Sequence, residues 1–599
     1  MPETTQAVQS QPTTPPPKIS SILKRRSARV LDHDPIVAPG FGTRKDLAKL
    51  AKELSSGTSV LPVEAVEAMM RSRGRGIGKT EEKAAAAPVS SAWADFMAEE
   101  GVGSTTTAAT SSSDTPSKKR KDAPAASVPG GKRVYELPIA AAGATTGSKK
   151  AKTSKEKGGV LLQTGTLDST VVGRSKVKLT EPYHLTEPTR ILPNVAITNV
   201  FTSCNAVHSV AVDTNGTAYG WGRNESAQLG GSFPDNVVMP TQLELPGKLV
   251  SAALGKSHTL FLLEDGSVWS VGNNKAGQCG VKAGTELVPN YRKCVFADPD
   301  VTVVQISCGE DFSAALTSDG YVYTAGSSEF GQLGNGETGE YIVSAGRMGF
   351  ANCNVFTCQA TFCHAPSEKV HGSGDSVKVI PLPEDVRIQQ IACGKHHTIA
   401  LEAVSDQPAR VFSFGCGDYG CLGHGIQADE YFPRCIGSLQ NIILGQGNVG
   451  LAAGAHCSLV QTGNGHLYYW GKHRSVGEAK MRPALVDALA NNQHVVSFCA
   501  AGGQTVVCST ANAVTVAWGQ DPHGALGLGE PKSSAKPTFV PALDGCRISS
   551  LACGYGHTLF VVRNEDKEDI TAVKKLAELD PDAVEGLVEA AESKESKRS

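Results

Sequence analysis

The chain has 599 residues, of which 40% are hydrophobic and 19% charged, with a formal net charge of −2. The near-neutral total hides a division, because residues 1–157 carry +9 and the remainder −11. The N-terminus is polar and rich in proline, and no stretch approaches the roughly 18 apolar residues of a membrane span. We therefore expect a soluble intracellular protein without a signal peptide or membrane segment, whose 16 cysteines are thiols.

Residues 1–157 are rich in Ala, Ser, Thr, Pro and Lys and poor in aromatic residues, which predicts a disordered basic tail. Clusters of lysine and arginine in this tail fit the acidic grooves of nuclear import receptors and also nucleic-acid phosphates. The alternative is a solvated run of charge. We expect the nuclear localisation and nucleic-acid contacts to come from Lys118, Lys119, Arg120, Lys121, Lys132 and Arg133.

Residues 158–563 repeat one unit about every 50 residues, and a period of this length indicates a propeller, solenoid or array. Each unit has an apolar run with a glycine turn, followed by a run with a hydrophobic period of two that ends in glycine. We expect the turn glycines to adopt φ > 0, which other residues rarely do. The first copy has asparagine at this position, and asparagine is the next best residue for such a conformation. These positions are Asn205, Gly255, Gly309, Gly394, Gly454, Gly502 and Gly554.

The repeat predicts an all-β fold, a β-propeller of small antiparallel sheets arranged radially. The last half-unit, 548–562, has no second half behind it, whereas 160–165 is a half-unit without a first half. Pairing the two gives seven blades and a ring closed by both chain ends, which we prefer to six blades. The remaining residues, 564–599, predict a charged and helical C-terminal tail.

Histidine recurs three residues after the turn glycine, at His208, His258, His397 and His557. A catalytic or metal histidine would not repeat around a ring, so we interpret these as structural, each bonded to backbone within its own blade. No nucleophile or pair of carboxylates stands in a recognisable motif, so we expect no covalent catalysis, no catalytic residues and no cofactor.

One large insertion, 335–386, interrupts the repeat. Its Cys353, Cys358, Cys363, His364 and His371 are spaced poorly for zinc, so we expect no metal and favour one protruding apolar hairpin. Because loops on rigid scaffolds carry binding, the insertion is a candidate for partner contact. The partner-contact candidates are Arg347, Met348 and Phe350 within it, and Asp311 at a blade turn.

The unit Ala392-Cys393-Gly394-x-x-His397-Thr398, with its Gly-Gln-Leu-Gly turns, resembles the regulator of chromosome condensation repeat over about residues 160–562. Finer features, such as Trp221-Gly222-Arg223-Asn224-Glu225, resemble one branch of that family. The resemblance implies a seven-bladed nuclear protein that associates with chromatin, centromeres, spindle microtubules and Ras-superfamily GTPases during cell division. The founding member is a nucleotide-exchange factor for the GTPase Ran, so the insertion is a candidate wedge and Asp311 a candidate exchange residue.

Three functions follow as hypotheses. The first is a nuclear scaffold of mitosis that binds chromatin, spindle components and small GTPases, found at chromosomes, centromeres and spindle and also in the cytoplasm. The second is a guanine nucleotide exchange factor for a Ran-, Rac- or Ral-like GTPase, and the third is a cytosolic interaction adaptor. None of them involves a membrane or a small-molecule substrate, and in all of them we expect function outside the repeat, in the insertion and the basic tail.

Overall fold

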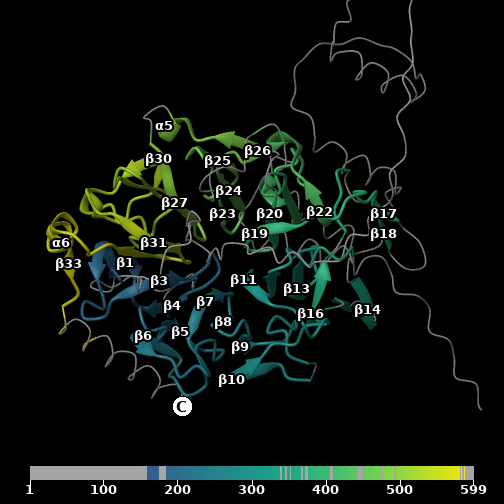
Figure 1. Cartoon of the computed structure of the whole chain (residues 1–599), viewed down its shortest axis with the longest axis horizontal. Helices are drawn as coiled ribbons and strands as arrows, with labels where there is room; N and C mark the ends of the chain where they lie inside the picture. Colours follow the sequence, from purple (N-terminus) through teal and green to yellow (C-terminus); the bar gives the residue numbers. More distant parts are fainter. Residues whose placement is uncertain are drawn as a thin grey trace, which may run out of the picture. The chain divides into compact units, whose positions relative to one another are not determined.

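Seven β-sheets surround one axis in the computed structural model of the chain (Figure 1). The structure describes residues 158–580, together with 582 and 586. Within that range the structure does not describe residues 171, 174–183, 283, 337–339, 345–346, 351, 360, 366–367, 371–375, 405–408, 441, 443–448, 475–476 and 491–493. The basic residues predicted for nuclear localisation, Lys118–Lys121, Lys132 and Arg133, therefore lie outside the described residues.

Six of the blades are continuous in sequence, and each of these has four antiparallel strands in chain order from the axis outward. Blade one comprises β3 (Ile197–Phe201), β4 (His208–Asp213), β5 (Ala218–Arg223) and β6 (Asn236–Gln242); blade two β7 (Leu249–Leu254), β8 (His258–Leu263), β9 (Val268–Asn273) and β10 (Leu287–Lys293); blade three β11 (Val303–Cys308), β12 (Phe312–Thr317), β13 (Val322–Gly326) and β16 (Cys353–Gln359).

The next three blades repeat this order. Blade four comprises β19 (Ile388–Cys393), β20 (His397–Glu402), β21 (Val411–Gly415) and β22 (Glu430–Cys435); blade five β23 (Gly450–Ala453), β24 (Cys457–Gln461), β25 (Leu467–Gly471) and β26 (Lys480–Leu485); blade six β27 (Val496–Ala501), β28 (Thr505–Thr510), β29 (Thr515–Gly519) and β30 (Ser534–Phe539). Short helical elements are η2 (Asp418–Gly420), η3 (Gly437–Leu439), α5 (Asp487–Ala490) and η4 (Pro541–Leu543).

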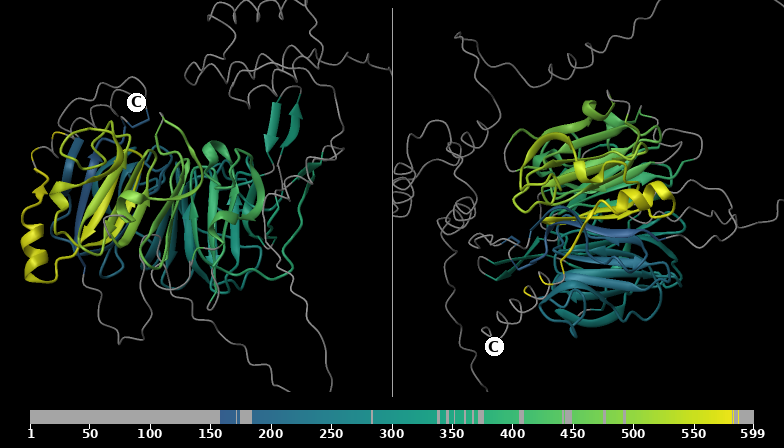
Figure 2. Two further views of the ribbon diagram at one scale, coloured as in Figure 1. Left: turned by 90° about the horizontal axis from the view of Figure 1, so that it is seen from above. Right: turned by 90° about the vertical axis from the view of Figure 1, so that its left-hand side faces the viewer.

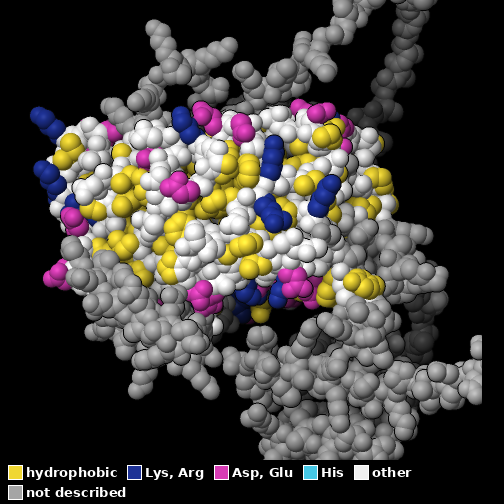
Figure 3. All heavy atoms as spheres, turned by 90° about the horizontal axis from the view of Figure 1, so that it is seen from below, with side chains coloured by type: hydrophobic (Ala, Val, Ile, Leu, Met, Phe, Trp, Pro, Cys, Tyr) yellow, Lys and Arg dark blue, Asp and Glu magenta, His cyan; other side chains and the backbone are white. Residues whose placement is uncertain are grey.

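Burial follows the distance from the axis. The second strand of every blade is buried at each of its residues, whereas outer strands such as β10 and β30 expose several. The first strands line a pocket on the axis, with small side chains such as those of Ala253, Ser307 and Ala392 among its lining residues. On the wall formed by β6 and β10, hydrophobic side chains lie between scattered charged ones of both signs (Figure 3).

The seventh blade joins the two ends of the repeat region, as predicted. It contains β31 (Ile548–Cys553), β32 (His557–Val562), β1 (Val160–Thr166) and β2 (His184–Arg190) in spatial order. Antiparallel pairing runs from Val160 opposite Val562 to Gly165 opposite His557. The N-terminal strand thus fills the gap left by the missing second half-unit, and the ring has no open edge at its seam.

The insertion prediction was wrong in one respect, because residues 335–386 do not form one hairpin. Between the third strand of blade three and β19 lie two separate hairpins, with β16 between them as the outer strand of the blade. They consist of β14 (Glu340–Ser344) with β15 (Arg347–Phe350), and β17 (Glu368–Val370) with β18 (Ser376–Lys378). Since neighbouring strands of a blade are antiparallel, the two hairpins leave the blade at opposite faces.

The C-terminal segment packs against the closing blade at the rim of the ring (Figures 1 and 2). Helix α6 (Lys567–Val573) begins at Asp566, whose carboxylate accepts hydrogen bonds from the N–H groups of Glu568 and Asp569. Val573 is buried in the core of this blade. Strand β33 (Ala577–Glu578) then pairs parallel to β2 as a fifth strand. The predicted charged C-terminal helix is thus part of the closure.

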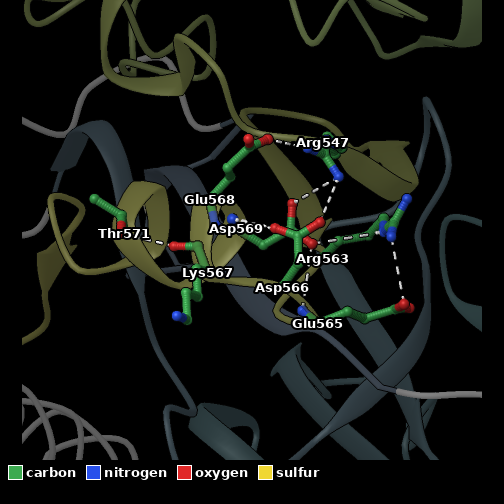
Figure 4. Close-up of polar contacts among 8 residues, drawn as sticks. All are labelled: Arg547, Arg563, Glu565, Asp566, Lys567, Glu568, Asp569 and Thr571. Atoms are coloured by element: carbon green, nitrogen blue, oxygen red, sulfur yellow. Dashed lines mark hydrogen bonds and ion pairs between the residues drawn. The ribbon is translucent and has the colours of Figure 1, made fainter.

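Two arginines hold α6 to the blade (Figure 4). The guanidinium of Arg547 lies 2.8 Å from Asp566, 2.6 Å from Glu568 and 3.6 Å from Asp569, and that of Arg563 lies 3.8 Å from Asp569. The Asp569 side chain is 1% exposed, whereas that of Glu568 is 84% exposed.

No helix among the described residues is long and apolar enough to cross a membrane.

These two carboxylates give a matched test of the closure. We expect Asp569→Ala to lower the free energy of unfolding by about 1–3 kcal/mol, because it leaves two arginines without their buried partner. Glu568→Ala removes an exposed ion pair and should change it by less than about 0.5 kcal/mol. Urea denaturation of both variants checks this, and equal effects would show that the buried ion pairs of Asp569 do not secure α6 to the blade.

Candidate partner-binding face

The recurring histidines are structural, but the predicted partner was wrong for three of the four. Each places its Nε2 within hydrogen-bond distance of a hydroxyl of the following blade, and His557 also bonds the backbone of Tyr555 in its own blade. His208 lies 2.8 Å from Thr259, His258 2.9 Å from Ser313, His397 2.9 Å from Ser458 and His557 2.8 Å from Ser209. The last of these bonds joins the closing blade to blade one.

The hydroxyls of Thr259, Ser313 and Ser458 fix which ring nitrogen of their histidine carries the proton, because each donates its own proton to a carbonyl. The Oγ of Ser313 donates its single proton to the carbonyl of Gln278 at 2.7 Å, so it can only accept from His258. Burial lowers the pKa of His208, His258 and His397 to about 3 and that of His557 to about 4. These imidazoles are therefore neutral at pH 7, and His208, His258 and His397 serve as hydrogen-bond donors between blades.

The turn glycines are required for a different reason from the one predicted. Gly255 is not among the glycines with positive φ, but a Cβ on it would lie 2.0 Å from Cε1 of His258. The glycine therefore leaves room for the imidazole. By contrast, the glycine at the end of the third strand, such as Gly222 with φ of 102°, does need left-handed backbone.

The turns between the first and second strands, which we call the hub turns, meet around the axis at one face, which we call the hub face. Backbone hydrogen bonds link hub turns of neighbouring blades: Lys256 N–H donates to Glu310, Glu310 N–H to Lys395, and Tyr555 N–H to Ala206, at 3.2, 2.9 and 2.9 Å. The hub face is thus a backbone-bonded surface whose side chains are presented from a rigid frame.

A carboxylate in contact with two lysines and a histidine lies within the hub turns of blades two to four. Glu310 contacts Lys256 at 2.5 Å, Lys395 at 3.3 Å and the Nε2 of His396 at 3.1 Å. Burial alone would raise the pKa of Glu310, but hydrogen bonds from His396 and Lys256 and the charge of Lys395 hold it well below its usual range. The Glu310 side chain is 11% exposed and that of Lys256 57%, so the cations face outward over a buried anion.

The predicted contact residue Asp311 lies beside this cluster. Its carboxylate accepts a hydrogen bond from Nε2 of Gln278 at 3.2 Å. Burial and the neighbouring charge of Glu310 raise the pKa of Asp311. Asp311 is therefore engaged within the protein, and the exposed charge of this region belongs to the lysines.

The other hub turns are not charged. Blades five, six and seven place Ala455, Gly503 and Tyr555 where blades two to four have Lys256, Glu310 and Lys395. A Cβ at Gly503 would lie 2.2 Å from Cδ2 of Tyr555, so the tyrosine ring rests against this glycine. The hub face consequently has a charged half and a half formed by small and aromatic residues.

Comparison with known sequences assigns the repeat. Models of the regulator of chromosome condensation (RCC1) repeat match residues 200–228, 249–278 and 303–332, and, in a second model, 215–262, 265–316, 409–460 and 517–561. Protein RCC2 of Homo sapiens is 33% identical over 395 residues, covering 65% of this chain and 72% of the relative. The Xenopus laevis homolog of RCC2 is 32% identical over 446 residues, with 72% and 83% covered.

The chain belongs to the RCC1-repeat family. Its likeness to the RCC2 relatives confirms the family resemblance identified from the sequence, including the branch suggested by the finer features. Among solved structures, Prp20p of Saccharomyces cerevisiae has a TM-score of 0.52 at 19% identity, covering 70% of this chain and 94% of that one. Yeast RCC1 (Prp20) bound to Kap60 has a TM-score of 0.51 at 18% identity, covering 72% and 97%. These two likenesses support the fold.

The remaining predicted contact residues lie in the insertion. Arg347, Met348 and Phe350 belong to β15, and β14–β15 connects the third and fourth strands of blade three. That connection leaves the blade on the hub face, whereas Asp311 lies nearer the axis on the same face. The structure thus places all four on one side of the ring at different distances from the axis, and their role in partner contact stays a prediction.

Sequence reasoning missed Glu310, Lys256 and Lys395. The signal was present, since residues of opposite charge directly follow the turn glycines of three consecutive units.

Reactive groups are scarce among the described residues of this RCC1-repeat ring. Among the described residues, no three His, Cys, Asp or Glu side chains are grouped to hold a metal ion. Burial raises the pKa of thiols such as Cys294 and Cys553 to about 12, which makes them poor nucleophiles.

The buried histidines predict a stability that falls with acid. An unfolded histidine takes up a proton below about pH 6.5, whereas the folded ones do not until far lower pH. Lowering the pH from 7 to 5 should therefore favour unfolding by about 1–2 kcal/mol per buried histidine. His258→Phe, which copies Phe312 in blade three, should make this pH dependence shallower, as measured by denaturation at both pH values. Substitution of the exposed His466 by Gln is the control, and an unchanged slope for His258→Phe would contradict the assignment.

Proposed function

We propose that this protein is a nuclear scaffold of mitosis that binds chromatin, spindle components and a small GTPase, with the hub face as the surface that holds a protein partner. The observation that carries the proposal is the rigid hub face, on which Lys256 and Lys395 are fixed over the buried Glu310. A surface of this kind is already ordered before a partner arrives, so less free energy is lost on binding. In this role the protein acts without covalent chemistry.

The names of the related proteins support this choice of partners. The structure of Prp20p is described with its binding properties to Gsp1p and histones, and yeast RCC1 (Prp20) was crystallised bound to Kap60. These are properties of those proteins. We carry them to this chain as a proposal, in which the basic tail binds an import receptor and nucleic acid, and the ring binds the GTPase.

The alternative of nucleotide exchange draws support from one observation, the β14–β15 hairpin on the hub face. A projecting element on the binding face could act as a wedge in a nucleotide site. The measurement of GDP release described next separates this alternative from the scaffold.

A panel of purified Ran-, Rac- and Ral-like GTPases provides that experiment. We expect the full chain to bind at least one of them without accelerating GDP release. Lys395→Ala should weaken binding about five- to tenfold, because it removes a half-buried lysine charge from the hub face. Lys536→Ala, at an exposed site on β30, should leave it unchanged. Accelerated GDP release would contradict the scaffold hypothesis and support the exchange-factor hypothesis. Absence of binding to every GTPase of the panel would show that a GTPase of these classes is not a partner.

The basic tail is tested separately. Changing Lys118–Lys121 to alanine should abolish nuclear accumulation of a fluorescent fusion and the localisation to mitotic chromosomes and spindle. It should also weaken DNA binding and flatten its salt dependence, because fewer phosphates are neutralised. Equal replacement of Lys282, Lys293, Lys532 and Lys536, on the ring, is the control. Unchanged nuclear localisation of the tail variant would show that another signal directs import, whereas exclusion of the unaltered chain from the nucleus would favour the cytosolic adaptor.

A further inference from the structure

Two cysteines face each other on neighbouring strands of blade six. Cys499 on β27 is directly opposite Cys508 on β28 in the antiparallel register. The turn that joins these strands is closed by a hydrogen bond from the Gly502 N–H to the Thr505 carbonyl, at 2.8 Å. Because hydrogen-bonded and non-hydrogen-bonded pairs alternate along an antiparallel ladder, Cys499 and Cys508 form a non-hydrogen-bonded pair.

This position suits a covalent bond between the two side chains. Residues of a non-hydrogen-bonded pair have Cα atoms about 4.5 Å apart, and disulfides span Cα distances of about 4.4–6.8 Å. Directly opposite residues also project their side chains to the same face of the sheet. In agreement with this, Cys508 is buried in the hydrophobic cluster between blades five and six, and Cys499 packs against the same cluster. Both are free thiols in the structure.

The corresponding position of the other six blades carries no sulfur. It is the fourth residue of the second strand, together with the residue opposite it on the first strand. The pairs are Val200 with Ala211, Ala252 with Phe261, Ile306 with Ala315, Ile391 with Ala400, Leu451 with Val460 and Leu551 with Phe560. Each pair includes a branched or aromatic side chain, so packing between blades does not require cysteine here.

One of the two thiols is open to a small oxidant. Cys499 is half-buried and lines the pocket on the axis, which we call the axial pocket, whereas Cys508 is fully buried and does not line it. The axial pocket has a volume of about 110 Å³, whereas a single water molecule needs only about 10–15 Å³. Hydrogen peroxide is little larger than water and therefore fits.

Another thiol of this region, that of Cys553 in blade seven, lies on the other side of the blade-six sheet. Cys553 is buried in the cluster between blades six and seven. This cluster also contains Ala500 and Val507, the next pair along the ladder. Because successive residues of a strand point to opposite faces, Cys499 points away from Cys553.

We propose that Cys499 and Cys508 are a site of oxidative modification, at which a peroxide that enters the axial pocket joins them in a disulfide between β27 and β28. The sulfur of Cys499 attacks one peroxide oxygen, the O–O bond breaks, and a sulfenic acid and one water molecule form. The sulfur of Cys508 then attacks the sulfenic sulfur and displaces a second water molecule. In total, two thiols lose two hydrogens and two electrons to one hydrogen peroxide, which becomes two molecules of water.

The environment makes this oxidation slow. Burial raises the pKa of Cys499 to about 12 and also raises the pKa of Cys508. Because the thiolate is the nucleophile, the bond forms under sustained exposure to peroxide and not in a reducing compartment. It closes a loop of ten residues, 499–508, which contains the hub turn of blade six. The disulfide thus covalently secures the turn against which the Tyr555 ring rests.

The test titrates the full chain with hydrogen peroxide, blocks the remaining thiols with iodoacetamide and digests the chain with trypsin. Peptide 481–532 contains Cys499 and Cys508 and no other cysteine. It should lose both alkyl groups and become lighter by two hydrogen atoms, and dithiothreitol should reverse both changes. Peptide 411–434 is the internal control, because its buried cysteines, Cys416 and Cys421, lie on one connection of blade four and not on opposite strands.

The control peptide should stay alkylated at peroxide concentrations that oxidise peptide 481–532. Oxidation of both peptides at the same concentration would show that peroxide does not select the opposed pair, and would overturn the proposal. Full alkylation of peptide 481–532 at every concentration that spares the control would also overturn it. So would a disulfide between peptide 481–532 and peptide 548–563, which contains Cys553.

Single variants test the order of the two steps. Both replace cysteine by alanine at a position where other blades have alanine, as at Ala252 and Ala315. Cys508→Ala removes the second thiol, so dimedone should trap several-fold more sulfenic acid at Cys499 than in the unaltered chain. Cys499→Ala should leave Cys508 as a thiol, because Cys508 does not line the axial pocket. Equal trapping at Cys499 with and without Cys508, or a dimedone adduct at Cys508 in Cys499→Ala, would overturn the proposal.

Discussion

The structure depends on one strand pairing, that of Val160–Thr166 with His557–Val562. A propeller blade is a small sheet, and a ring of such sheets is stable only when its first and last members are joined. Here the two chain ends supply different halves of one blade, so about 400 residues of intervening chain are held by a single seam. The C-terminal helix and β33 cover the outside of that seam, which explains why a charged tail belongs to an otherwise all-β fold.

The closed ring allows the blades to be joined by buried hydrogen bonds. The sequence of donation from histidine Nε2–H to hydroxyl, and from hydroxyl to carbonyl, needs three groups from two blades at fixed positions. If the seam opened, the pair of His557 and Ser209 would separate, and two buried polar groups would lose their partners. Closure of the ring and the hydrogen bonds between blades therefore stabilise each other. The hub face is rigid because both hold its turns in place.

The repeat, the seven blades and the closure could be predicted because they depend on patterns within one unit and on a count of half-units. The partners of the histidines could not, because Ser313 stands 55 residues from His258 and the link between them exists only after the blades pack. The purpose of the turn glycines was misjudged for the same reason. A glycine needed for φ > 0 and a glycine needed to make room for an imidazole look alike in sequence.

The division of the insertion into two hairpins was also beyond sequence reasoning. Cys353 and Cys358 looked like part of a cysteine-rich insertion, but they belong to β16, which pairs with β13 across a 26-residue gap in sequence between Gly326 and Cys353. An outer strand carries a weak hydrophobic signal because one side of it faces solvent. Period alone therefore could not separate it from the hairpins around it.

The candidate site changes where function is expected in this fold. The sequence suggested that a repeat with a structural histidine leaves function to the insertion and the tail. In the unit Gly-x-x-His, however, the glycine and the histidine carry the contacts between blades, and the two residues between them need only form the turn. Those two positions are Lys256-Ser257 in blade two, Glu310-Asp311 in blade three and Tyr555-Gly556 in blade seven. A framework that fixes the outer two residues leaves the inner two free to differ, so the repeat itself can build an asymmetric binding surface around its axis.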